Sequence, residues 1–382
     1  MKRVLFVATV DMYTRTGGGL ATKAYYNAFK AVFQGNLDLI HAEDYFQGEQ
    51  SDSIILQSRP STCRRLGNLL RGHLHRFYPF LIEYLFLNRN KYECCIINGG
   101  VFAGDSILQI QSWGIKVWVI HHNFERQYHI LNKTVESYGG LSCYWINKWE
   151  RIAYLNANVN LFLTQYDMDI FAQNYGRPRG RCFLTGCFEA VDKSLVGKLD
   201  NPFVKSLVIS GALNFPQTEK AIVYFLQKYF NLLEQRKFTL LVTGRNPSDR
   251  LVQMIHEKGA QIVASPDDID SVICSASIYL CPISDGGGFK LRIMDGLRLG
   301  MPVIAHVNSM RGYEMLMERP YFVSYNSTSS FVEGLHKIEE GMTRNLLNSK
   351  EIQKDYITYF SLSAGVRKIL SIYKEVSNDI IV

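Results

Sequence analysis

Three consecutive glycines, Gly286–Gly288, lie between an apolar run that ends at Cys281 and a segment that carries Lys290 and Arg292. Glycine adopts positive φ angles at little cost, so its backbone can approach a ligand closely. We predict that a helix starts directly after the glycines and points its unpaired N–H groups and the positive end of its dipole at this turn. Such an arrangement favours a phosphate. Basic residues in a first helical turn oppose the dipole, and an external anion would explain them.

A carboxylate follows at a distance that suits a nucleotide. Asp295 comes seven residues after Gly288, about two turns or roughly 10 Å along a helix. It would share a face with the glycines, whereas Phe289, Ile293 and Leu297 form an apolar face at a spacing of four residues. An anion site with a carboxylate at this separation fits a nucleotide diphosphate whose ribose hydroxyls reach the acid.

The first half of the chain holds a similar order of strand, glycines and helix. The apolar run Val4–Val10 is typical of a buried parallel strand. Gly17–Gly19 then precede a predicted helix over Leu20–Phe33. Gly18 and Gly19 are therefore candidates for a second anion or sugar site. A plain tight turn is the alternative, because doubly wound folds commonly place glycines after the first strand.

Two histidines follow another predicted strand, Val117–Ile120, directly at its end. Open α/β sheets bind their ligands beyond the carboxyl ends of their strands. His122 is therefore a candidate site residue, and His121 is the close alternative. A purely structural role for the histidine is the other interpretation. Glu125 would either orient this loop or cap the helix after it.

The composition restricts the class of protein. The chain has 382 residues, of which 47% are hydrophobic and 20% charged, and this is enough for the cores of two or three domains. The net charge of +7 suits an anionic ligand or an acidic membrane surface, whereas nucleic acid would require a concentrated basic face. The eight cysteines form no Cys-x-x-Cys pair and no zinc-type spacing with histidine. We therefore expect no metal site and a reducing, cytosolic compartment.

Predicted strands and helices alternate along both halves, which indicates an α/β fold of two Rossmann-like β/α/β domains. We expect an N-terminal domain over 1–195, a C-terminal domain over 196–355 and a final helical segment over 356–382. No run of 18 apolar residues occurs, so we expect no membrane-spanning helix.

One segment, residues 64–87, is basic and amphipathic. It contains no acidic residue before Glu83, and arginines and histidines lie around the side of the predicted helix that is not apolar. The residues predicted to share one helical face are Leu66, Leu69, Leu70, Leu74 and Phe77. Such a segment could lie on an anionic membrane surface. The alternative is an ordinary helix with a solvated basic face, and its glycines weaken the helix prediction.

With these motifs in view, the chain resembles the retaining GT-B glycosyltransferases of family 4, the glycosyl transferases group 1. A subgroup carries three glycines, a small residue, Arg-Leu-Lys, two apolar residues and Glu, followed by a Gly-Lys-Pro-Val-Val-like strand. The matching residues here are Gly286-Gly287-Gly288-Phe289-Lys290-Leu291-Arg292-Ile293-Met294-Asp295 and Gly300-Met301-Pro302-Val303-Ile304. The similarity covers residues 200–375 well and the first half only in outline.

The resemblance implies two Rossmann-like domains that face each other across a cleft. It implies transfer of a sugar from a nucleotide diphosphate-sugar to a hydroxyl acceptor, with retained configuration and without a metal or other cofactor. The acceptor would be a saccharide or a lipid-linked saccharide in surface polysaccharide synthesis. The enzyme would be cytoplasmic and could be peripheral on the inner face of the cell membrane.

The resemblance also implies roles for individual residues. His122 would contact the donor sugar, Lys290 would bind the diphosphate together with Arg292, and Asp295 would bind the ribose. Arg245, in a Gly-Arg-Asn-Pro segment, would contact the base or the diphosphate unless that segment is only a turn. The residues expected to contact the donor are Gly18, Gly19, Arg245, Gly286, Gly287, Gly288, Phe289, Lys290, Leu291, Arg292 and Asp295.

Two departures from the family pattern keep an alternative open. Gly287 occupies the position of the first of two family glutamates, and Ala212 and Thr218 replace a basic pair that many members carry. The alternative is a non-catalytic GT-B subunit that stabilises a partner glycosyltransferase. An NAD-linked Rossmann enzyme is disfavoured, because the segment Thr16–Leu20 lacks the Gly-x-Gly-x-x-Gly spacing.

Overall fold

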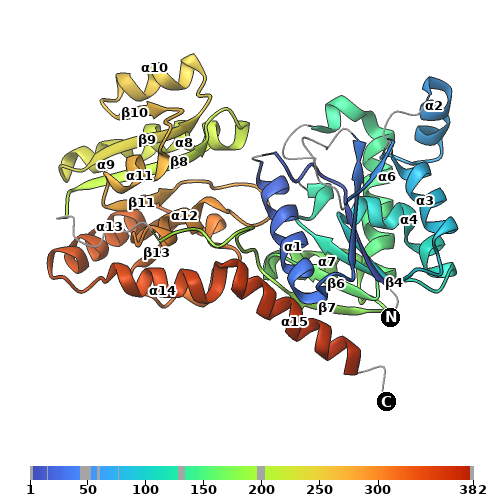
Figure 1. Cartoon of the computed structure of the whole chain (residues 1–382). Coiled ribbons are helices and arrows are strands. Elements are labelled where there is room, and N and C mark those ends of the chain that lie inside the picture. The colour runs from blue at the N-terminus through green and yellow to red at the C-terminus, as the bar shows by residue number, and fades with distance from the viewer. Residues whose placement is uncertain are drawn as a thin grey trace. The chain divides into compact units, whose positions relative to one another are not determined.

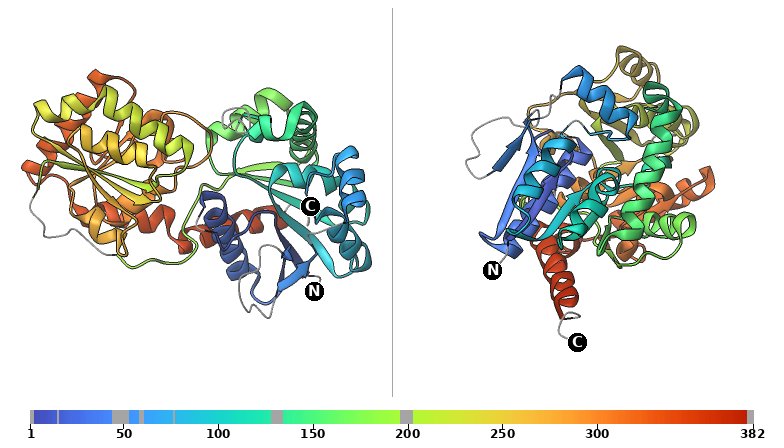
Figure 2. Two further views of the ribbon diagram at one scale, coloured as in Figure 1. Left: turned by 90° about the horizontal axis from the view of Figure 1, so that it is seen from above. Right: turned by 90° about the vertical axis from the view of Figure 1, so that its right-hand side faces the viewer.

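The structure is a computed structural model that describes residues 3–14, 16–43, 53–57, 61–75, 77–127, 134–195 and 203–378. The chain divides into two compact units. Unit 1 comprises Met1–Asp192 and Ser361–Val382, and unit 2 comprises Lys193–Phe360. Each unit contains a parallel sheet with helices on both faces (Figures 1 and 2).

The sheet of unit 1 has seven strands in the order β3-β2-β1-β4-β5-β6-β7, and every pairing is parallel. Its strands are β1 (Arg3–Ala8), β2 (Leu37–Ala42), β3 (Ser53–Leu56), β4 (Tyr92–Asn98), β5 (Lys116–His121), β6 (Val159–Phe162) and β7 (Arg181–Leu184). Its helices are α1 (Gly17–Phe33), α2 (Thr62–Leu70), α3 (Tyr78–Leu87), α4 (Gly100–Ser112), α6 (Thr134–Asn156), α7 (Gln165–Tyr175) and α15 (Leu362–Asn378). The central strands are continuous apolar runs because helices cover both of their sides.

The sheet of unit 2 has six parallel strands in the order β10-β9-β8-β11-β12-β13. Its strands are β8 (Ser206–Ala212), β9 (Thr239–Arg245), β10 (Gln261–Ala264), β11 (Ile278–Cys281), β12 (Val303–His306) and β13 (Phe322–Tyr325). Its helices are α8 (Pro216–Lys228), α9 (Phe230–Gln235), α10 (Asp249–Glu257), α11 (Ile269–Cys274), α12 (Arg292–Arg298), α13 (Thr328–Thr343) and α14 (Ser349–Phe360), with 3-10 turns η2 (Val307–Met310) and η3 (Glu314–Leu316).

The final helical segment is shared between the two units. Ile352, Tyr356 and Phe360 of α14 are buried in the core of unit 2. After Phe360 the chain enters unit 1, where α15 packs against α1 and the ring of Tyr373 lies 5.0 Å from that of Phe33. The returning helix therefore begins after Phe360, and the predicted start at 356 is wrong because α14 completes the core of unit 2. The first boundary between the units lies after Asp192, close to the predicted boundary after residue 195.

The prediction that Leu66, Leu69, Leu70, Leu74 and Phe77 share the face of one helix within residues 64–87 is wrong. The segment forms two helices, because α2 ends at Leu70 and α3 begins at Tyr78. Gly72, between them, has a φ of 88°, and a side chain there would collide with the ring of Trp145. Leu66 and Leu70 are 61% and 67% exposed rather than packed against the domain. In the described part of the chain, no helix is both long enough and apolar enough to cross a membrane.

Candidate functional site

The glycine turn of unit 2 follows β11 and is held by side chains on its carbonyl groups. The carbonyl oxygens of five successive residues, 283–287, each accept a side-chain hydrogen bond. The donors, in that order, are Ser309 Oγ (2.6 Å), Asn308 Nδ2, Gln217 Nε2 (2.5 Å), Arg311 Nη1 (3.4 Å) and Lys290 Nζ (2.7 Å). Gly286 and Gly288 have φ angles of 83° and 71°, which L side chains rarely adopt.

The N–H groups of Gly286–Gly288 form no hydrogen bond to any residue that the structure describes. Successive backbone N–H groups in a turn that includes left-handed residues create a concave anion-binding surface. The turn therefore combines fixed carbonyls with unpaired donors, as a phosphate site requires.

The helix after this turn starts later than predicted. Phe289 and Lys290 are in a loop, and α12 begins at Arg292, so Lys290 is not in a first helical turn. The backbone carbonyl of Lys290 accepts the hydroxyl of Tyr313 at 2.9 Å, and the ring of Phe289 lies 4.4 Å from that of Tyr313. These contacts hold the loop in place of a helical turn. Phe289 and Leu291 pack against the core of unit 2.

Arg292 reaches the carboxyl end of β8. Its Nη2 donates to Thr218 Oγ1 at 3.0 Å, and a Cβ at Gly211 would lie 2.7 Å from its guanidinium carbon. Its Nη1 is buried and has no hydrogen-bond partner within the described structure. Leaving a buried charged donor unsatisfied is costly. The guanidinium of Arg292 on α12 therefore lies beside Thr218, one of the two positions at which many family members carry a basic residue.

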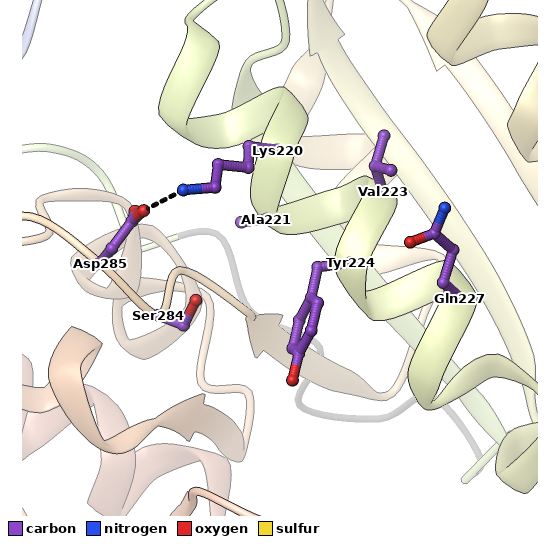
Figure 3. A pocket seen from close by; sticks show the side chains of 7 residues that line it. All are labelled: Lys220, Ala221, Val223, Tyr224, Gln227, Ser284 and Asp285. Carbon is purple, nitrogen blue, oxygen red and sulfur yellow. Dashed lines mark hydrogen bonds and ion pairs between the residues drawn. The ribbon is translucent and has the colours of Figure 1, made fainter. Parts of the chain in front are cut away.

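A pocket of about 330 Å³ lies beside the glycine turn, between α8 and residues 284–285 (Figure 3). Lys220 on α8 forms an ion pair with Asp285, with 2.8 Å between Nζ and Oδ2. The remaining lining residues are Ala221, Val223, Tyr224, Gln227 and Ser284. Its volume is at the lower end for small-molecule sites.

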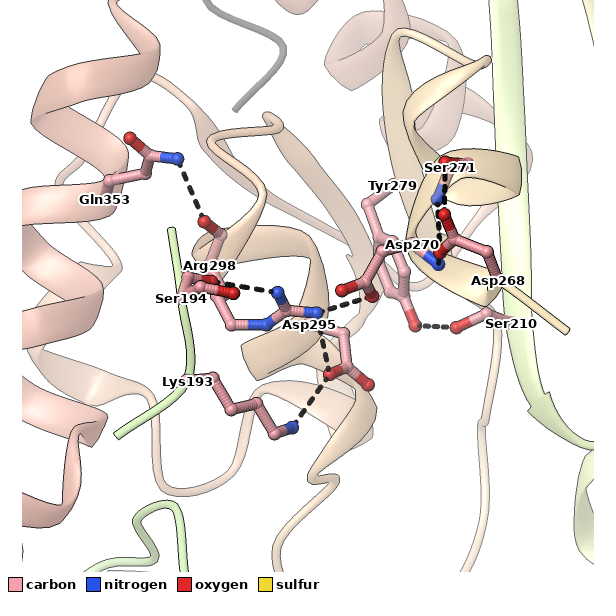
Figure 4. Close-up of polar contacts among 10 residues, drawn as sticks. All are labelled: Lys193, Ser194, Ser210, Asp268, Asp270, Ser271, Tyr279, Asp295, Arg298 and Gln353. Atoms are coloured by element: carbon pink, nitrogen blue, oxygen red, sulfur yellow. Dashed lines mark hydrogen bonds and ion pairs between the residues drawn. The ribbon is translucent and has the colours of Figure 1, made fainter. Parts of the chain in front are cut away.

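Asp295 lies on α12 within a network of cations (Figure 4). Its Oδ1 is 3.4 Å from Lys193 Nζ and 3.9 Å from Arg298 Nη2, and its side chain is 34% exposed. Arg298 is buried, and it donates to Asp270 at 2.6 Å and to the carbonyl of Ser194 at 3.3 Å. These contacts fix the orientation of the carboxylate while leaving part of it open to a ligand.

Arg245 is the last residue of β9 and is exposed. Its carbonyl accepts the N–H of Leu213 at 2.9 Å, which places it at the same edge of the sheet as the end of β8. Gly244 has a φ of 147°, and a side chain there would collide with the carbonyl of Gly211.

In unit 1 the two histidines at the end of β5 have different surroundings. His121 is buried, stacks on Phe162 at 4.8 Å and donates from Nε2 to Asn160 Oδ1 at 2.8 Å. Burial lowers the pKa of His121 to about 4. Its ring is enclosed by aromatic side chains, which is typical of a structural histidine.

His122 is only partly buried and belongs to a hydrogen-bonded chain. Asn98 Nδ2 donates to Thr22 Oγ1 at 2.7 Å, and Thr22 in turn donates to the carbonyl of Gly18 at 2.7 Å. The other amide atom, Asn98 Oδ1, therefore faces His122 Nε2 at 2.7 Å and accepts a hydrogen bond from its N–H group. Burial lowers the pKa of His122 to about 4, so the ring is neutral near pH 7 and Nδ1 remains an acceptor. The glycine run and the histidine are thus connected through β4, although the sequence treated them separately.

Gly18 and Gly19 belong to the first turn of α1. Thr16 caps the helix by accepting the N–H of Gly19 at 3.2 Å. A Cβ at Gly19 would lie 2.6 Å from the carbonyl of Asp11 and 2.7 Å from that of Thr14. Close backbone packing therefore requires glycine at position 19.

Glu125, three residues after His122, lies beside the buried Glu150 of α6. Glu150 Oε1 accepts the N–H of Glu125 at 2.6 Å, and its Oε2 accepts the hydroxyl of Tyr175 at 2.9 Å. Burial raises the pKa of Glu125 to about 7 and that of Glu150 to about 8. The described residues contain no group of three or more His, Cys, Asp or Glu side chains that could hold a metal ion.

Several residues of these arrangements were not predicted from sequence: Thr22, Asn98, Gln217, Asn308 and Arg311. Thr22 and Gln217 lie in the first two turns of helices, Asn98 is the last residue of β4, and Asn308 and Arg311 follow β12 within five residues. Position at the carboxyl end of a parallel sheet is the one signal that could have indicated them.

Comparisons with known proteins agree with this architecture. Residues 204–339 match the family described as glycosyl transferases group 1. No curated protein matches the chain in sequence. HepE from Anabaena, solved with UDP-glucose, shares 12% identity and a TM-score of 0.64, over 98% of this chain and 100% of that one.

Two further solved structures are similar over their whole length. Sucrose-phosphate synthase from Thermosynechococcus elongatus shares 14% identity and a TM-score of 0.67, over 99% of this chain and 100% of that one. The lipopolysaccharide outer core galactosyltransferase WaaB shares 12% identity and a TM-score of 0.64, over 98% and 100% of the two chains. The chain therefore has the GT-B glycosyltransferase fold of two Rossmann-like domains, and its segment 204–339 matches the glycosyl transferases group 1.

Proposed function

We propose that the chain is a glycosyltransferase that moves a sugar from a nucleotide diphosphate-sugar to a hydroxyl acceptor and retains the anomeric configuration. The observation that carries the proposal is the guanidinium of Arg292 beside Gly211 and Thr218, with a buried and unpartnered Nη1. The unpaired N–H groups of Gly286–Gly288 supply further donors in the same unit. Together they form a receptor for a diphosphate.

The chemistry follows from these groups. Negative charge develops on the leaving diphosphate as the bond to the sugar breaks, and fixed donors stabilise it. Arg292 and the glycine N–H groups would bind this charge, Lys290 would add positive charge next to Gly287, and Asp295 would bind the ribose hydroxyls. His122, neutral and with Nδ1 as an acceptor, would contact the sugar. We propose that the step uses these donors and no metal or other cofactor.

One of the similar structures supports the choice of donor, because HepE is solved with UDP-glucose. The match of residues 204–339 to the glycosyl transferases group 1 agrees with this choice, because that segment includes Arg292 and Asp295.

The decisive experiment measures binding and turnover of UDP-, GDP- and ADP-sugars by the wild type and by Arg292→Ala. We expect the substitution to weaken donor binding about a hundredfold, because it removes charge-assisted hydrogen bonds to phosphate. Arg250→Ala is the matched control, since Arg250 is exposed on α10. Equal affinities of the wild type and Arg292→Ala for the sugar nucleotides would show that Arg292 does not bind the donor.

A second candidate function is a non-catalytic subunit that stabilises a partner glycosyltransferase. It is favoured by Gly287, which provides no carboxylate in the glycine turn. The same donor panel separates the two candidates. Turnover supports the enzyme, whereas the absence of both binding and turnover across the panel supports the subunit.

We propose, in addition, a saccharide or lipid-linked saccharide of surface polysaccharide synthesis as acceptor, at the inner face of the cell membrane. One of the similar structures is named as a lipopolysaccharide galactosyltransferase. On α2 and α3, four large apolar side chains are 49–72% exposed, namely Leu66, Leu70, Phe86 and Leu87. Exposed apolar groups in a basic segment suit an anionic bilayer.

Vesicle sedimentation tests this membrane contact. The protein should bind vesicles that contain anionic lipid, and binding should decrease with added salt. Leu70→Ser should weaken the binding, whereas Leu346→Ser in unit 2, also 67% exposed, should not. Absent or salt-independent binding would contradict the proposal.

A further inference from the structure

The segment that follows β12 is in direct contact with the glycine turn, although the two are separated in the sequence. Asn308 Nδ2 donates to the carbonyl of Ser284, Ser309 Oγ to that of Ile283, and Arg311 Nη1 to that of Gly286. Three of the five fixed carbonyls of the turn are therefore bound by this one short segment.

The segment is itself held in one conformation. The N–H of Asn308 donates to His306 Nδ1 at 3.2 Å, and Arg311 Nη2 donates to Asn308 Oδ1 at 3.0 Å. The amide of Asn308 is thereby oriented at both ends, because Oδ1 accepts from Arg311 while Nδ2 donates to Ser284. Ser309 is fully buried, which leaves its hydroxyl little freedom.

Peptide geometry connects these carbonyl contacts to the N–H groups. A peptide unit is planar and trans, so its C=O and the N–H of the next residue point in opposite directions. Fixing the carbonyl of Gly286 on Arg311 therefore fixes the N–H of Gly287 on the other side. In the same way, the hydrogen bond from Gln217 to the carbonyl of Asp285 fixes the direction of the N–H of Gly286. The hydrogen bond from Lys290 to the carbonyl of Gly287 fixes that of the N–H of Gly288.

We propose that Arg311 and Asn308 are positioning residues that prepare the glycine turn for an anion before any ligand arrives. Arg311 aims the N–H of Gly287, and Asn308 acts on it by orienting the guanidinium of Arg311 while also fixing the carbonyl of Ser284 at the start of the turn. Glycine residues have the largest conformational freedom, so a turn with three of them would otherwise lose much entropy on binding. Donors that are already oriented stabilise charge without reorganisation. The assignment of the anion as the diphosphate of a sugar donor rests on the proposed function.

The first experiment monitors the turn in the protein without ligand. Backbone amide signals and hydrogen exchange of Gly286–Gly288 are compared in the wild type, Asn308→Ala and Arg311→Gln. We expect shifted glycine signals and faster exchange in both variants, with Asn326→Ala on an exposed site of unit 2 as the matched control. Unchanged glycine signals in a folded variant would overturn the positioning role, whatever the protein binds.

The second experiment measures affinity for inorganic pyrophosphate and for UDP by calorimetry. Asn308→Ala removes no charge, and we expect about a tenfold loss of affinity that is the same at low and high salt. Arg311→Lys keeps the charge and loses the forked contact, so it should lose affinity similarly, whereas a purely electrostatic role predicts full retention. Wild-type affinity in Asn308→Ala contradicts the positioning proposal, and a wild type that binds neither probe contradicts both this proposal and the proposed function.

Should Asn308→Ala fail to fold, Asn308→Leu provides the same test. It keeps the approximate shape of the side chain, adds no charge, and removes both the donor to Ser284 and the acceptor for Arg311. We expect the same shift of the glycine signals and at least the same loss of affinity for pyrophosphate. Retained signals and retained affinity would again reject the proposal.

Discussion

The two glycine runs of the chain are alike in sequence and different in structure. Both Gly17–Gly19 and Gly286–Gly288 come after a buried strand and before a helix. The first run forms the opening turn of α1, and the N–H of Gly19 is capped by Thr16. The second run is separated from α12 by a loop, and its N–H groups have no partner among the described residues.

The requirement for glycine also differs between the runs. In the first, Gly19 lies against the backbone of residues 11–14, so it is a requirement of packing. In the second, Gly286 and Gly288 have positive φ angles that turn the backbone. A run of glycines after a strand therefore does not by itself locate an anion site, because the direction of the N–H groups depends on what binds the carbonyls.

The surrounding charges follow the same division. In unit 1, burial keeps His122, which directly follows β5, and Glu150 of α6 neutral near pH 7. The turn in unit 2 is next to Lys290, Arg292 and Arg311. The titratable groups next to the end of β5 are thus uncharged, whereas those next to the glycine turn of unit 2 are cationic.

The largest expected effect tests the second run. Gly286→Ala introduces a side chain at a φ of 83°, where its Cβ would collide with the amide of Gln217. We expect about a hundredfold weaker binding of a nucleotide diphosphate, because at least one N–H would lose its direction. Calorimetry measures the affinity, and a loss of only twofold or less would contradict the view that this turn is the anion site.

The matching change in the first run should act on stability instead. Gly19→Ala forces a Cβ against two backbone carbonyls, and we expect a loss of about 1–3 kcal/mol in the free energy of unfolding of unit 1. Chemical denaturation measures this loss, and Gly67→Ala, where a Cβ meets open space, is the control. Donor affinity at low temperature should stay within a few-fold of the wild type, and a large selective loss would assign Gly19 to a ligand site.

The last prediction concerns the protonation of Glu150 in unit 1, whose effect within any single pH unit is the smallest of the three. The pKa of Glu150 is raised from 4.5 to about 8, so the folded state keeps a proton that the unfolded chain releases above 4.5. Its favourable contribution is complete below pH 4.5 and is lost as the pH rises toward 8, by up to about 1.4 kcal/mol per pH unit. Glu150→Gln should flatten this decline in melting experiments between pH 5 and 8. An identical slope in wild type and variant would show that Glu150 is ionised in the folded protein.

The α/β fold was accessible from sequence because its signal is local. Continuous apolar runs such as Val4–Val10 mark buried parallel strands, and β1 is found there over Arg3–Ala8. The prediction of a helix directly after Gly288 was wrong, because Tyr313 and Lys290 hold the loop through contacts that local preference does not contain. The contact of Arg292 with Thr218 joins residues 74 positions apart, which no local sequence pattern can predict.

The candidate site was accessible to a similar degree. The glycines, Lys290 and Arg292 could be selected because their residue types are unusual for a helix start, and Asp295 because of its spacing from the glycines. The polar residues that hold them could not be selected, since Asn308 and Gln217 are common residue types without a distinctive spacing. The chain Gly18–Thr22–Asn98–His122 likewise joins three separate elements and becomes visible only in the folded structure.

The order of the two units along the chain has a consequence for biosynthesis. Unit 2 is one continuous stretch that is complete at Phe360, whereas unit 1 contains α15, which is synthesised after all of unit 2. Lys368 of α15 donates to the carbonyl of Thr185, and Gly365 packs against Phe188. The N-terminal part of unit 1 therefore cannot complete its packing until α15 has been synthesised. On the ribosome, the second domain in the chain is therefore the first that can be finished.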